Sequence, residues 1–414
     1  MSWGTNVLVG QSGGPTAVIN SSLAGVYEAA KALGAAHVYG MEYGIQGLLQ
    51  GKIVDLDDRL DDKMEIELLK RTPSSYLGSC RFKLPNPATD ERPFVQLFEL
   101  FAKYCIGAVF YIGGNDSMDT IAKLSAYGAA KGSEIRFIGV PKTIDNDLFG
   151  TDHCPGFASA AKYIATSCME VSKDCRVYDT GTITVVEIMG RHAGWLAGSA
   201  ALATYAGAGP DLVYLPEVPF RMEEFWQDVD RIYRQNGSCM VAVSEGVQYA
   251  DGRFVAESGD RDVFGHTQLG GLGAMLAESV KRQTGAKVRS IELSLLQRCA
   301  SHVASKTDID EAYMAGKAAV EAAISGQTDK MVAFERITEN GIYSCKTKLI
   351  GLGEVANVEK LVPREWINAR GNGVEQPFID YVLPLIQGET AMQKEYSLPR
   401  FAKLRKVPAK PEQR

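Results

Sequence analysis

The sequence predicts an α/β fold built on two mostly parallel sheets. Three observations predict it. Several short segments are apolar throughout, as strands buried on both faces of a parallel sheet are. Patterns typical of helices alternate with these segments. Glycine-rich or polar residues follow strand after strand, at the edge where open α/β sheets bind their ligands. We therefore expect one shared site at the carboxyl ends of the strands.

Size and composition narrow the class of protein. The chain has 414 residues, 45% of them hydrophobic and 23% charged, with a formal net charge of -6. This composition is typical of a globular protein with enough apolar residues for a large core. No basic run is present, so a nucleic-acid or membrane partner is not expected. The eight scattered cysteines and the absence of a signal-peptide pattern favour a cytoplasmic protein.

The first unit of the chain is a strand, a glycine-rich turn and a helix. The strand covers residues 6–10, and the helix runs from about Ala17 to Leu33. Between them stand Gly13 and Gly14. Glycine at such a turn lets backbone N–H groups approach an anion, and the helix N-terminus adds a positive dipole. A tight structural turn explains this segment equally well.

The same unit repeats further along the chain. A strand at residues 107–112 precedes Gly113-Gly114-Asn115-Asp116-Ser117 and a helix that ends near Ala130. The next strand, residues 135–140, runs into the loop of residues 141–147. Further strands are expected at residues 182–189, 212–215, 240–244 and 288–293.

Two carboxylates in the loop after residue 140 are candidates for catalysis. Asp145 and Asp147 flank Asn146, just past a strand. Such carboxylates serve as a general base or position a metal, although an Asx-turn explains the same string. Lys142 precedes them in the same loop. Mixed charge suits phosphoryl transfer, in which one group accepts a proton while another neutralises phosphate oxygens.

Charged residues near other strand ends are candidates for binding. Arg191 follows one strand, and Arg289 and Arg298 flank another. Each could grip a phosphate or form a surface ion pair. Glu245 follows the strand at 240–244 and could bind sugar hydroxyls or cap the next element.

Together these motifs resemble the 6-phosphofructokinase family. The residues that carry the resemblance are Gly13-Gly14, Gly113 to Ser117, Pro141 to Asp147, Met189-Gly190-Arg191, Ser244-Glu245-Gly246 and Gln297-Arg298. The match is close up to about Thr307 and loose beyond it. It implies two Rossmann-like lobes with the active site in the cleft between them. The implied donor lobe is 1–141 plus about 297–340, the sugar-phosphate lobe 142–296, and a helical extension and tail 341–414.

The resemblance implies a role for each motif. Asp145 matches the base that takes the proton from the sugar 1-hydroxyl, while Thr143 and Asp147 match neighbours that orient the hydroxyl and the phosphoryl group. Gly14 and Arg81 match contacts to the phosphoryl donor. The further sugar-phosphate residues implied are Met189, Gly190, Arg191, Glu245, Arg289 and Arg298. Arg289 would come from a neighbouring subunit, so a homodimer or homotetramer is expected.

Two positions separate the donor classes of the family. Members that use ATP resemble a pattern with glycine where this chain has Asp116 and Lys142. A carboxylate at 116 occupies the place of the nucleotide α-phosphate and repels it, while an ammonium at 142 holds a small, highly charged donor. We therefore expect reversible phosphoryl transfer from pyrophosphate to fructose 6-phosphate, a glycolytic step that gives fructose 1,6-bisphosphate and phosphate.

The chain also departs from the family. Members that use pyrophosphate carry a magnesium-serving Asp where this chain has Asn115. We expect Mg²⁺ to be held through water at Asn115, by the pyrophosphate itself, and by Asp116 or Asp145. Thr182 and Leu295 replace an Arg and a His of the family's sugar site, so other acceptors such as sedoheptulose 7-phosphate stay open.

Three other functions are weighed against this one. Asp116 and Lys142 argue against an ATP-dependent enzyme of the same fold. Asn115 alone favours a non-catalytic phosphosugar-binding paralogue, which the intact Asp145 and Asp147 oppose. A kinase of another acceptor has similar Gly-Gly-Asp loops, but the sugar-side motifs disfavour it.

Overall fold

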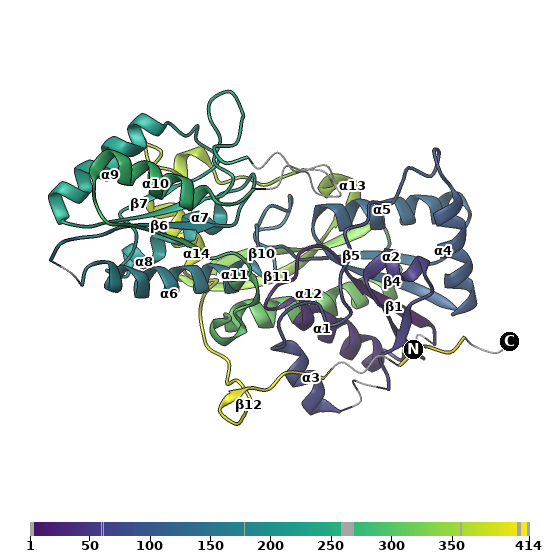
Figure 1. Cartoon of the computed structure of the whole chain (residues 1–414). Coiled ribbons are helices and arrows are strands. Elements are labelled where there is room, and N and C mark those ends of the chain that lie inside the picture. The colour runs from purple at the N-terminus through teal and green to yellow at the C-terminus, as the bar shows by residue number, and fades with distance from the viewer. Residues whose placement is uncertain are drawn as a thin grey trace.

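Two helix-covered sheets form two lobes of the chain (Figure 1). The structure is a computed structural model, and it describes residues 4–58, 60, 62–177, 179–257, 269–356, 358–403 and 407–411. The first sheet has seven strands in the order β11-β10-β5-β4-β1-β2-β3, and the second has four in the order β7-β8-β6-β9. Most neighbouring strands run parallel, which confirms the predicted α/β class.

The first sheet is parallel in its centre and antiparallel at both edges, where β3 pairs with β2 and β11 pairs with β10. Its strands are β1 (Asn6–Gln11), β2 (Val38–Met41), β3 (Ile53–Asp55), β4 (Ile106–Gly113), β5 (Arg136–Pro141), β10 (Lys330–Glu339) and β11 (Ile342–Gly351). Every residue of β1 is buried, and β4 is buried along nearly all its length. Strands enclosed on both faces need apolar side chains throughout, which is the pattern their sequence shows.

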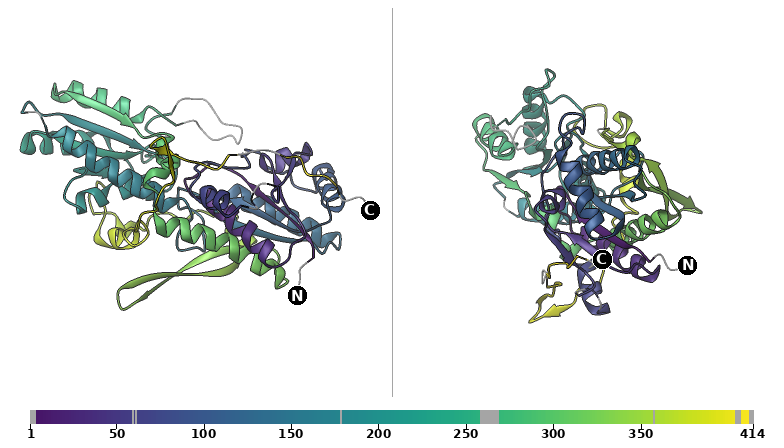
Figure 2. Two further views of the ribbon diagram at one scale, coloured as in Figure 1. Left: turned by 90° about the horizontal axis from the view of Figure 1, so that it is seen from below. Right: turned by 90° about the vertical axis from the view of Figure 1, so that its right-hand side faces the viewer.

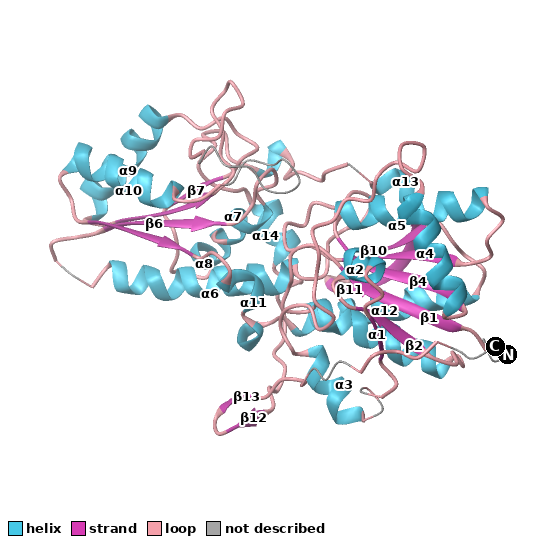
Figure 3. Ribbon diagram, turned by 45° about the vertical axis from the view of Figure 1, so that its right-hand side comes forward, coloured by secondary structure: helices cyan, strands magenta, loops and turns pink. Residues whose placement is uncertain are grey.

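Helices cover both faces of the first sheet (Figure 3). One core cluster joins α1 and α12 to the sheet, and another joins α4 and α5 to its other face. The helices of this lobe are α1 (Ile19–Ala32), α2 (Gly44–Leu49), α3 (Lys63–Lys70), α4 (Arg92–Lys103), α5 (Asn115–Ala130), α12 (Lys306–Ile324) and α13 (Leu352–Val355). The glycine-rich turns therefore lie between a buried strand and a packed helix, which fixes their backbone.

The second lobe has a smaller and wholly parallel sheet. Its strands are β6 (Ile183–Ile188), β7 (Leu212–Tyr214), β8 (Cys239–Ser244) and β9 (Val288–Glu292). Its helices are α6 (Phe157–Cys175), α7 (Trp195–Ser199), α8 (Ala201–Tyr205), α9 (Met222–Asn236), α10 (Leu272–Thr284), α11 (Leu296–Cys299) and α14 (Gln376–Val382), with 3-10 turns η1 (Ser301–Val303) and η2 (Arg364–Trp366). Two core clusters again lie on opposite faces of the sheet.

The chain after residue 340 differs from the helical extension that the sequence led us to expect. It begins with β11, which pairs with β10 from Glu339↔Ile342 to Lys330↔Gly351. Beyond β11, the described residues hold only the short helices α13 and α14, the turn η2 and two two-residue strands. The β-branched and aromatic residues of β11 favour the extended backbone. The outer half of this hairpin projects from the first lobe (Figure 2).

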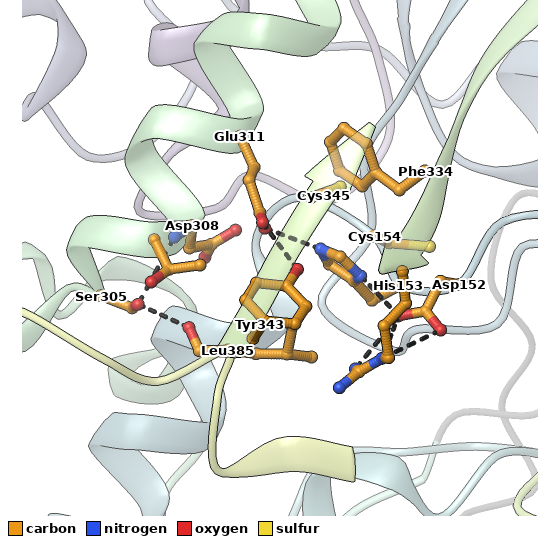
Figure 4. A network of polar contacts seen from close by, with 12 residues as sticks. Asp152, His153, Cys154, Ser305, Asp308, Glu311, Phe334, Tyr343, Cys345 and Leu385 are labelled. Carbon is orange, nitrogen blue, oxygen red and sulfur yellow. Dashed lines mark hydrogen bonds and ion pairs between the residues drawn. The ribbon is translucent and has the colours of Figure 1, made fainter. Parts of the chain in front are cut away.

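The carboxylate of Asp308 helps to join the two lobes. The two oxygens of Asp308, on α12, accept hydrogen bonds from the backbone N–H groups of Gly156 and Ser159, each at 2.9 Å. Ser305 precedes α12, and its hydroxyl donates to the carbonyl of Leu385 at 2.6 Å (Figure 4). Because a carboxylate at a helix N-terminus satisfies unpaired N–H groups and complements the helix dipole, Asp308 ties the start of α6 to α12.

The last described residues return to the first lobe. The N–H of Asp55 donates to the carbonyl of Val407 at 3.1 Å, and the N–H of Ala409 donates to the carbonyl of Ile53 at 2.9 Å. This segment thus lies along β3 at the edge of the first sheet. A small hairpin of β12 (Lys394–Glu395) and β13 (Leu398–Pro399) stands apart before it (Figure 3). Among the described helices, none is long and apolar enough to cross a bilayer.

Candidate active site

Lys142 is buried beneath the first glycine-rich turn. Its ammonium donates to the carbonyl oxygen of Gly14 at 2.6 Å, and its side chain is 2% exposed. At Gly13, φ is +75°, and a Cβ there would lie 3.2 Å from the ammonium nitrogen. Burial lowers the pKa of Lys142 to about 8, although the neighbouring Asp145 and Asp147 oppose the shift. The loop after β5 thus places the Lys142 ammonium beside the turn after β1.

The carboxylates of the same loop lie beside this cation. The N–H of Asp145 donates to the hydroxyl of Thr143 at 3.1 Å. Burial, with repulsion from Asp147 and Glu245, raises the pKa of Asp145 to about 7, while Lys142 and Arg191 oppose the rise. Burial also raises the pKa of Asp147. A carboxyl group with a pKa near neutrality is suited to accept a proton from a hydroxyl.

Asn115 and Asp116 stand at the N-terminus of α5, after the second glycine pair. The amide nitrogen of Asn115 donates to a carboxylate oxygen of Asp147 at 3.4 Å. Its amide oxygen is buried and has no hydrogen-bond partner within the described part of the chain. Asp116 is exposed in the first turn of the helix. The site therefore offers an unsatisfied oxygen beside a carboxylate.

Residues of the second lobe close the other side of the site. The N–H of Gly190 donates to the carboxylate of Glu245 at 3.3 Å, and the N–H of Met189 donates to the side-chain oxygen of Gln297 at 3.3 Å. A Cβ on Gly246 would lie 2.0 Å from the carbonyl oxygen of Arg191, so only glycine fits there. Burial raises the pKa of Glu245, and the charge of Arg191 opposes the rise.

Arg298 reaches from α11 toward the first lobe. A Cβ on Gly14 would lie 3.5 Å from one of its guanidinium nitrogens. Burial and the charge of Arg81 lower the pKa of Arg298, while Cys299 and Asp145 oppose the shift. Arg81, Lys142 and Arg298 therefore gather positive charge around the Gly13-Gly14 turn. The positive potential of these three side chains attracts a polyanion to the turn.

Arg289 is not part of this group within one chain. It lies on β9, at the edge of the second sheet, opposite Thr184 of β6. Its guanidinium pairs with Asp174 of α6 at 3.0 Å, and both side chains are exposed. The structure thus brings together the other predicted site residues and leaves Arg289 outside.

Three residues near the site were missed by the sequence argument. No role was predicted for Asn146, yet its side chain is fully buried and bonded to Tyr381. The N–H of Lys360 donates to the carbonyl of Asp147 at 2.8 Å. Tyr381 and Lys360 stand in the part of the chain that resembles the family only loosely. A positive φ of 56° at Asn146 is the kind of conformation that an Asp-Asn-Asp string could have suggested.

Comparison with known proteins identifies the family. A family model described as Phosphofructokinase matches residues 6–323, which is more than half of the chain. The chain belongs to the phosphofructokinase family. The match begins with β1 and ends with α12, so it includes every site residue described above except Lys360 and Tyr381.

Relatives within the phosphofructokinase family extend the likeness to nearly the whole chain. Proteins named pyrophosphate–fructose 6-phosphate 1-phosphotransferase from Halomonas elongata and Methylococcus capsulatus are each 43% identical to it. These alignments cover 97% and 96% of this chain and 96% of each relative. The crystal structure of a pyrophosphate-dependent phosphofructokinase from Nitrosospira multiformis is similar, with a TM-score of 0.89, 38% identity and 99% of both chains covered.

Proposed function

We propose that this protein transfers a phosphoryl group from pyrophosphate to the 1-hydroxyl of fructose 6-phosphate. The observation that carries the proposal is the buried Lys142 ammonium under the Gly13-Gly14 turn, with Asp116 exposed in the first turn of α5 after the second glycine pair. A small donor with high charge matches a buried cation, whereas a nucleotide would bring its α-phosphate against a carboxylate. The names of the full-length relatives support the same donor and acceptor.

In the proposed reaction, the carboxylates and the cations of the site have separate roles. Asp145 takes the proton of the 1-hydroxyl as the hydroxyl oxygen attacks one phosphorus of pyrophosphate. The bond from that phosphorus to the bridging oxygen breaks, and orthophosphate leaves. Thr143 and Asp147 orient the reacting groups, while Lys142, Arg81 and Arg298 stabilise the developing negative charge. Phosphoryl transfer demands little covalent work of a protein, so position and charge dominate.

The sugar-phosphate is bound by the second lobe in this proposal. Met189, Gly190 and Glu245 form its pocket, and Arg191 adds positive charge beside Glu245. Arg298 stands between the two lobes and is also available to the 6-phosphate.

Magnesium fits the donor side. Asn115 supplies a buried amide oxygen without a partner, and Asp147 supplies a carboxylate within reach of the same amide. Amide and carboxylate oxygens are the ligands that Mg²⁺ takes in proteins. We propose that Asn115 and Asp147 hold Mg²⁺, directly or through water, together with the pyrophosphate oxygens. When bound, the ion neutralises charge on the donor.

We further propose a homodimer or homotetramer in the cytoplasm. Arg289 is exposed on an edge strand and away from its own site, a placement that supports its use by a neighbouring subunit. The eight cysteines are all free thiols, as a reducing compartment favours.

A donor comparison tests the proposed function. Purified protein, Mg²⁺ and fructose 6-phosphate are mixed with pyrophosphate or with ATP, and fructose 1,6-bisphosphate is measured. We expect product with pyrophosphate and none with ATP. Product mainly with ATP would remove Asp116 and Lys142 from donor selection, and no product with either would favour a binding role or another acceptor.

The pH dependence of kcat/KM is expected to be bell-shaped, with limbs near pH 7 and pH 8. Asp145 must be deprotonated to act as a base, so activity rises as pH passes its pKa of about 7. Lys142 must be protonated to neutralise the donor, so activity falls above its pKa of about 8. The profile of kcat/KM reports such groups in the free enzyme.

Substrate phosphates also titrate near pH 6, so a variant is needed to show which group produces the acidic limb of the profile. Glu245 raises the pKa of Asp145 through its negative charge. Glu245→Gln is therefore expected to move the acidic limb to lower pH. A limb that stays in place would show that it belongs to another group.

A further inference from the structure

The loop that carries the two catalytic carboxylates is held by the C-terminal part of the chain. Residues 143–155 leave β5 and return to the start of α6, with the N–H of Thr143 donating to the carbonyl of Pro155 at 3.3 Å. Two later residues, Lys360 and Tyr381, contact this loop from outside. Both lie beyond residues 6–323, which the family model matches. The segment that the family model does not describe thus contributes to the positioning of the loop.

Tyr381 of α14 bonds to two points of the loop through one oxygen. The amide nitrogen of Asn146 donates to the Tyr381 hydroxyl at 2.8 Å, and that hydroxyl donates to the carbonyl of Asp152 at 2.6 Å. The side-chain oxygen of Asn146 accepts the N–H of Cys154 at 2.9 Å. The ring of Tyr381 packs in the core of the second lobe against Trp195, with centroids 5.1 Å apart. The hydroxyl is therefore fixed in space.

Lys360 adds a second set of bonds to the same loop. Its backbone N–H donates to the carbonyl of Asp147 at 2.8 Å, and its ammonium donates to the carbonyls of Thr151 and Asp152 at 3.3 and 2.5 Å. Its own carbonyl accepts the indole N–H of Trp195 at 2.8 Å. The segment around residue 360 is thus anchored in the second lobe and bonded to the backbone of a catalytic residue.

The backbone conformation of Asn146 connects these hydrogen bonds to the two catalytic carboxylates. It adopts a φ of 56°, a conformation in which a residue other than glycine needs support from its surroundings. It stands between Asp145 and Asp147, so its backbone angles set the direction of both carboxylates. Every side-chain hydrogen bond of Asn146 in the described part of the chain goes to Tyr381 or to the Cys154 backbone.

A buried ionic network supports the loop from behind (Figure 4). His153 lies between two carboxylates, 2.9 Å from Asp152 and 2.7 Å from Glu311. Burial lowers the pKa of His153, but its bonds to Asp152 and Glu311 outweigh burial and raise the pKa. Arg336 of β10 pairs with Asp152 at 3.1 Å and donates to the carbonyl of Tyr381 at 2.9 Å. A protonated His153 donates through both nitrogens, so it joins the two carboxylates and has no lone pair of its own for a metal.

We propose that the Tyr381 hydroxyl is a positioning group for catalysis, which holds Asn146 in its left-handed conformation and so aims Asp145 and Asp147 at the reacting atoms. This inference rests on the proposed function. Tyr381 touches no substrate and acts through Asn146, with Lys360 fixing the other end of the carboxylate pair. A small displacement of a reacting group is enough to slow catalysis strongly, even when substrates still bind.

The test is Tyr381→Phe, which removes one oxygen and keeps the packed ring. With pyrophosphate and fructose 6-phosphate, we expect kcat to fall by about 10- to 100-fold and both KM values to change by less than about threefold. Tyr127→Phe is the matched control. The Tyr127 hydroxyl, on α5, donates to Glu91 at 2.9 Å, outside the network that supports the loop. We expect this control to lower Tm by a similar amount and to keep kcat.

Equal losses of kcat in both variants, or an unchanged kcat in Tyr381→Phe, would overturn the inference. A second variant covers the case in which Tyr381→Phe folds poorly. Asn146→Gly keeps access to the left-handed backbone but removes the amide, and we expect it to lose kcat as Tyr381→Phe does. The double variant should lose no more than either single one, whereas additive losses would contradict a shared bond. If the unmodified protein forms no product from pyrophosphate, the proposed function fails instead, because the comparison of variants then has no starting activity.

Discussion

Replacing Asp145 with asparagine is expected to lower kcat for phosphoryl transfer by about 10²- to 10⁴-fold, the contribution that a general base makes. Asparagine keeps the shape of the side chain but cannot take the proton of the 1-hydroxyl. Binding should persist, since Arg191, Glu245 and Gly190 are unchanged. Steady-state kinetics with pyrophosphate, together with binding of fructose 6-phosphate measured by calorimetry, checks both halves of the prediction.

Folding should not suffer in Asp145→Asn. Burial raises the pKa of Asp145 to about 7, so above that pH the folded state holds a carboxylate at a cost that asparagine does not have. Asp230→Asn is a suitable control, because Asp230 is on the surface of α9 and pairs with Arg234 at 2.8 Å. Turnover of Asp145→Asn within tenfold of the unmodified protein would remove Asp145 from the role of base.

Replacing Lys142 with methionine is expected to lower kcat/KM for pyrophosphate by about 10²- to 10³-fold, as loss of one preorganised charge at a transition state does. Methionine fills a similar volume but supplies no positive charge beneath the Gly13-Gly14 turn. The KM for fructose 6-phosphate should change little. Initial rates with each substrate varied in turn separate the two effects.

The same variant is expected to be as stable as the unmodified protein or more stable. The pKa of Lys142 falls from 10.5 to about 8 on folding, so below pH 8 the charged side chain costs roughly 3 kcal/mol. Loss of the bond to the Gly14 carbonyl offsets about 1 kcal/mol of that gain. Lys317→Met, at an exposed position of α12, controls for the substitution itself. If activity and Tm both fell, the loss of activity would be due to impaired folding. That result would contradict the proposed role of the Lys142 charge.

The central strands and the glycine-rich turns were predictable from sequence. Residues 6–10, 107–112 and 135–140 are apolar throughout, and they form β1, β4 and β5 within one residue at each end. The strands of the second lobe were found in the same way. Their loops meet because parallel strands end at one edge, so most of the site followed from local patterns and topology.

The C-terminal part that begins with β10 was not predictable by the same means. The outer half of the β10–β11 hairpin has only exposed and half-buried residues, so it lacks the apolar run that marked the other strands. The bond from Asn146 to Tyr381 joins residues 235 positions apart. No periodicity within a segment reports such a contact, which depends on where two lobes place separate segments in space.

The order of the strands in the first sheet has a consequence for synthesis on the ribosome. The centre of this sheet, from β1 to β5, emerges before any of the second lobe, but its outer partners come last. The edge of β5 has no partner strand until β10 is synthesised, and the edge of β3 has none until residues 407–409 are synthesised. Unpaired edges of this kind recruit other chains. A nascent chain that stalls between residues 175 and 330 would therefore be prone to aggregate, and translation speed across the second lobe becomes part of how this protein reaches its native state.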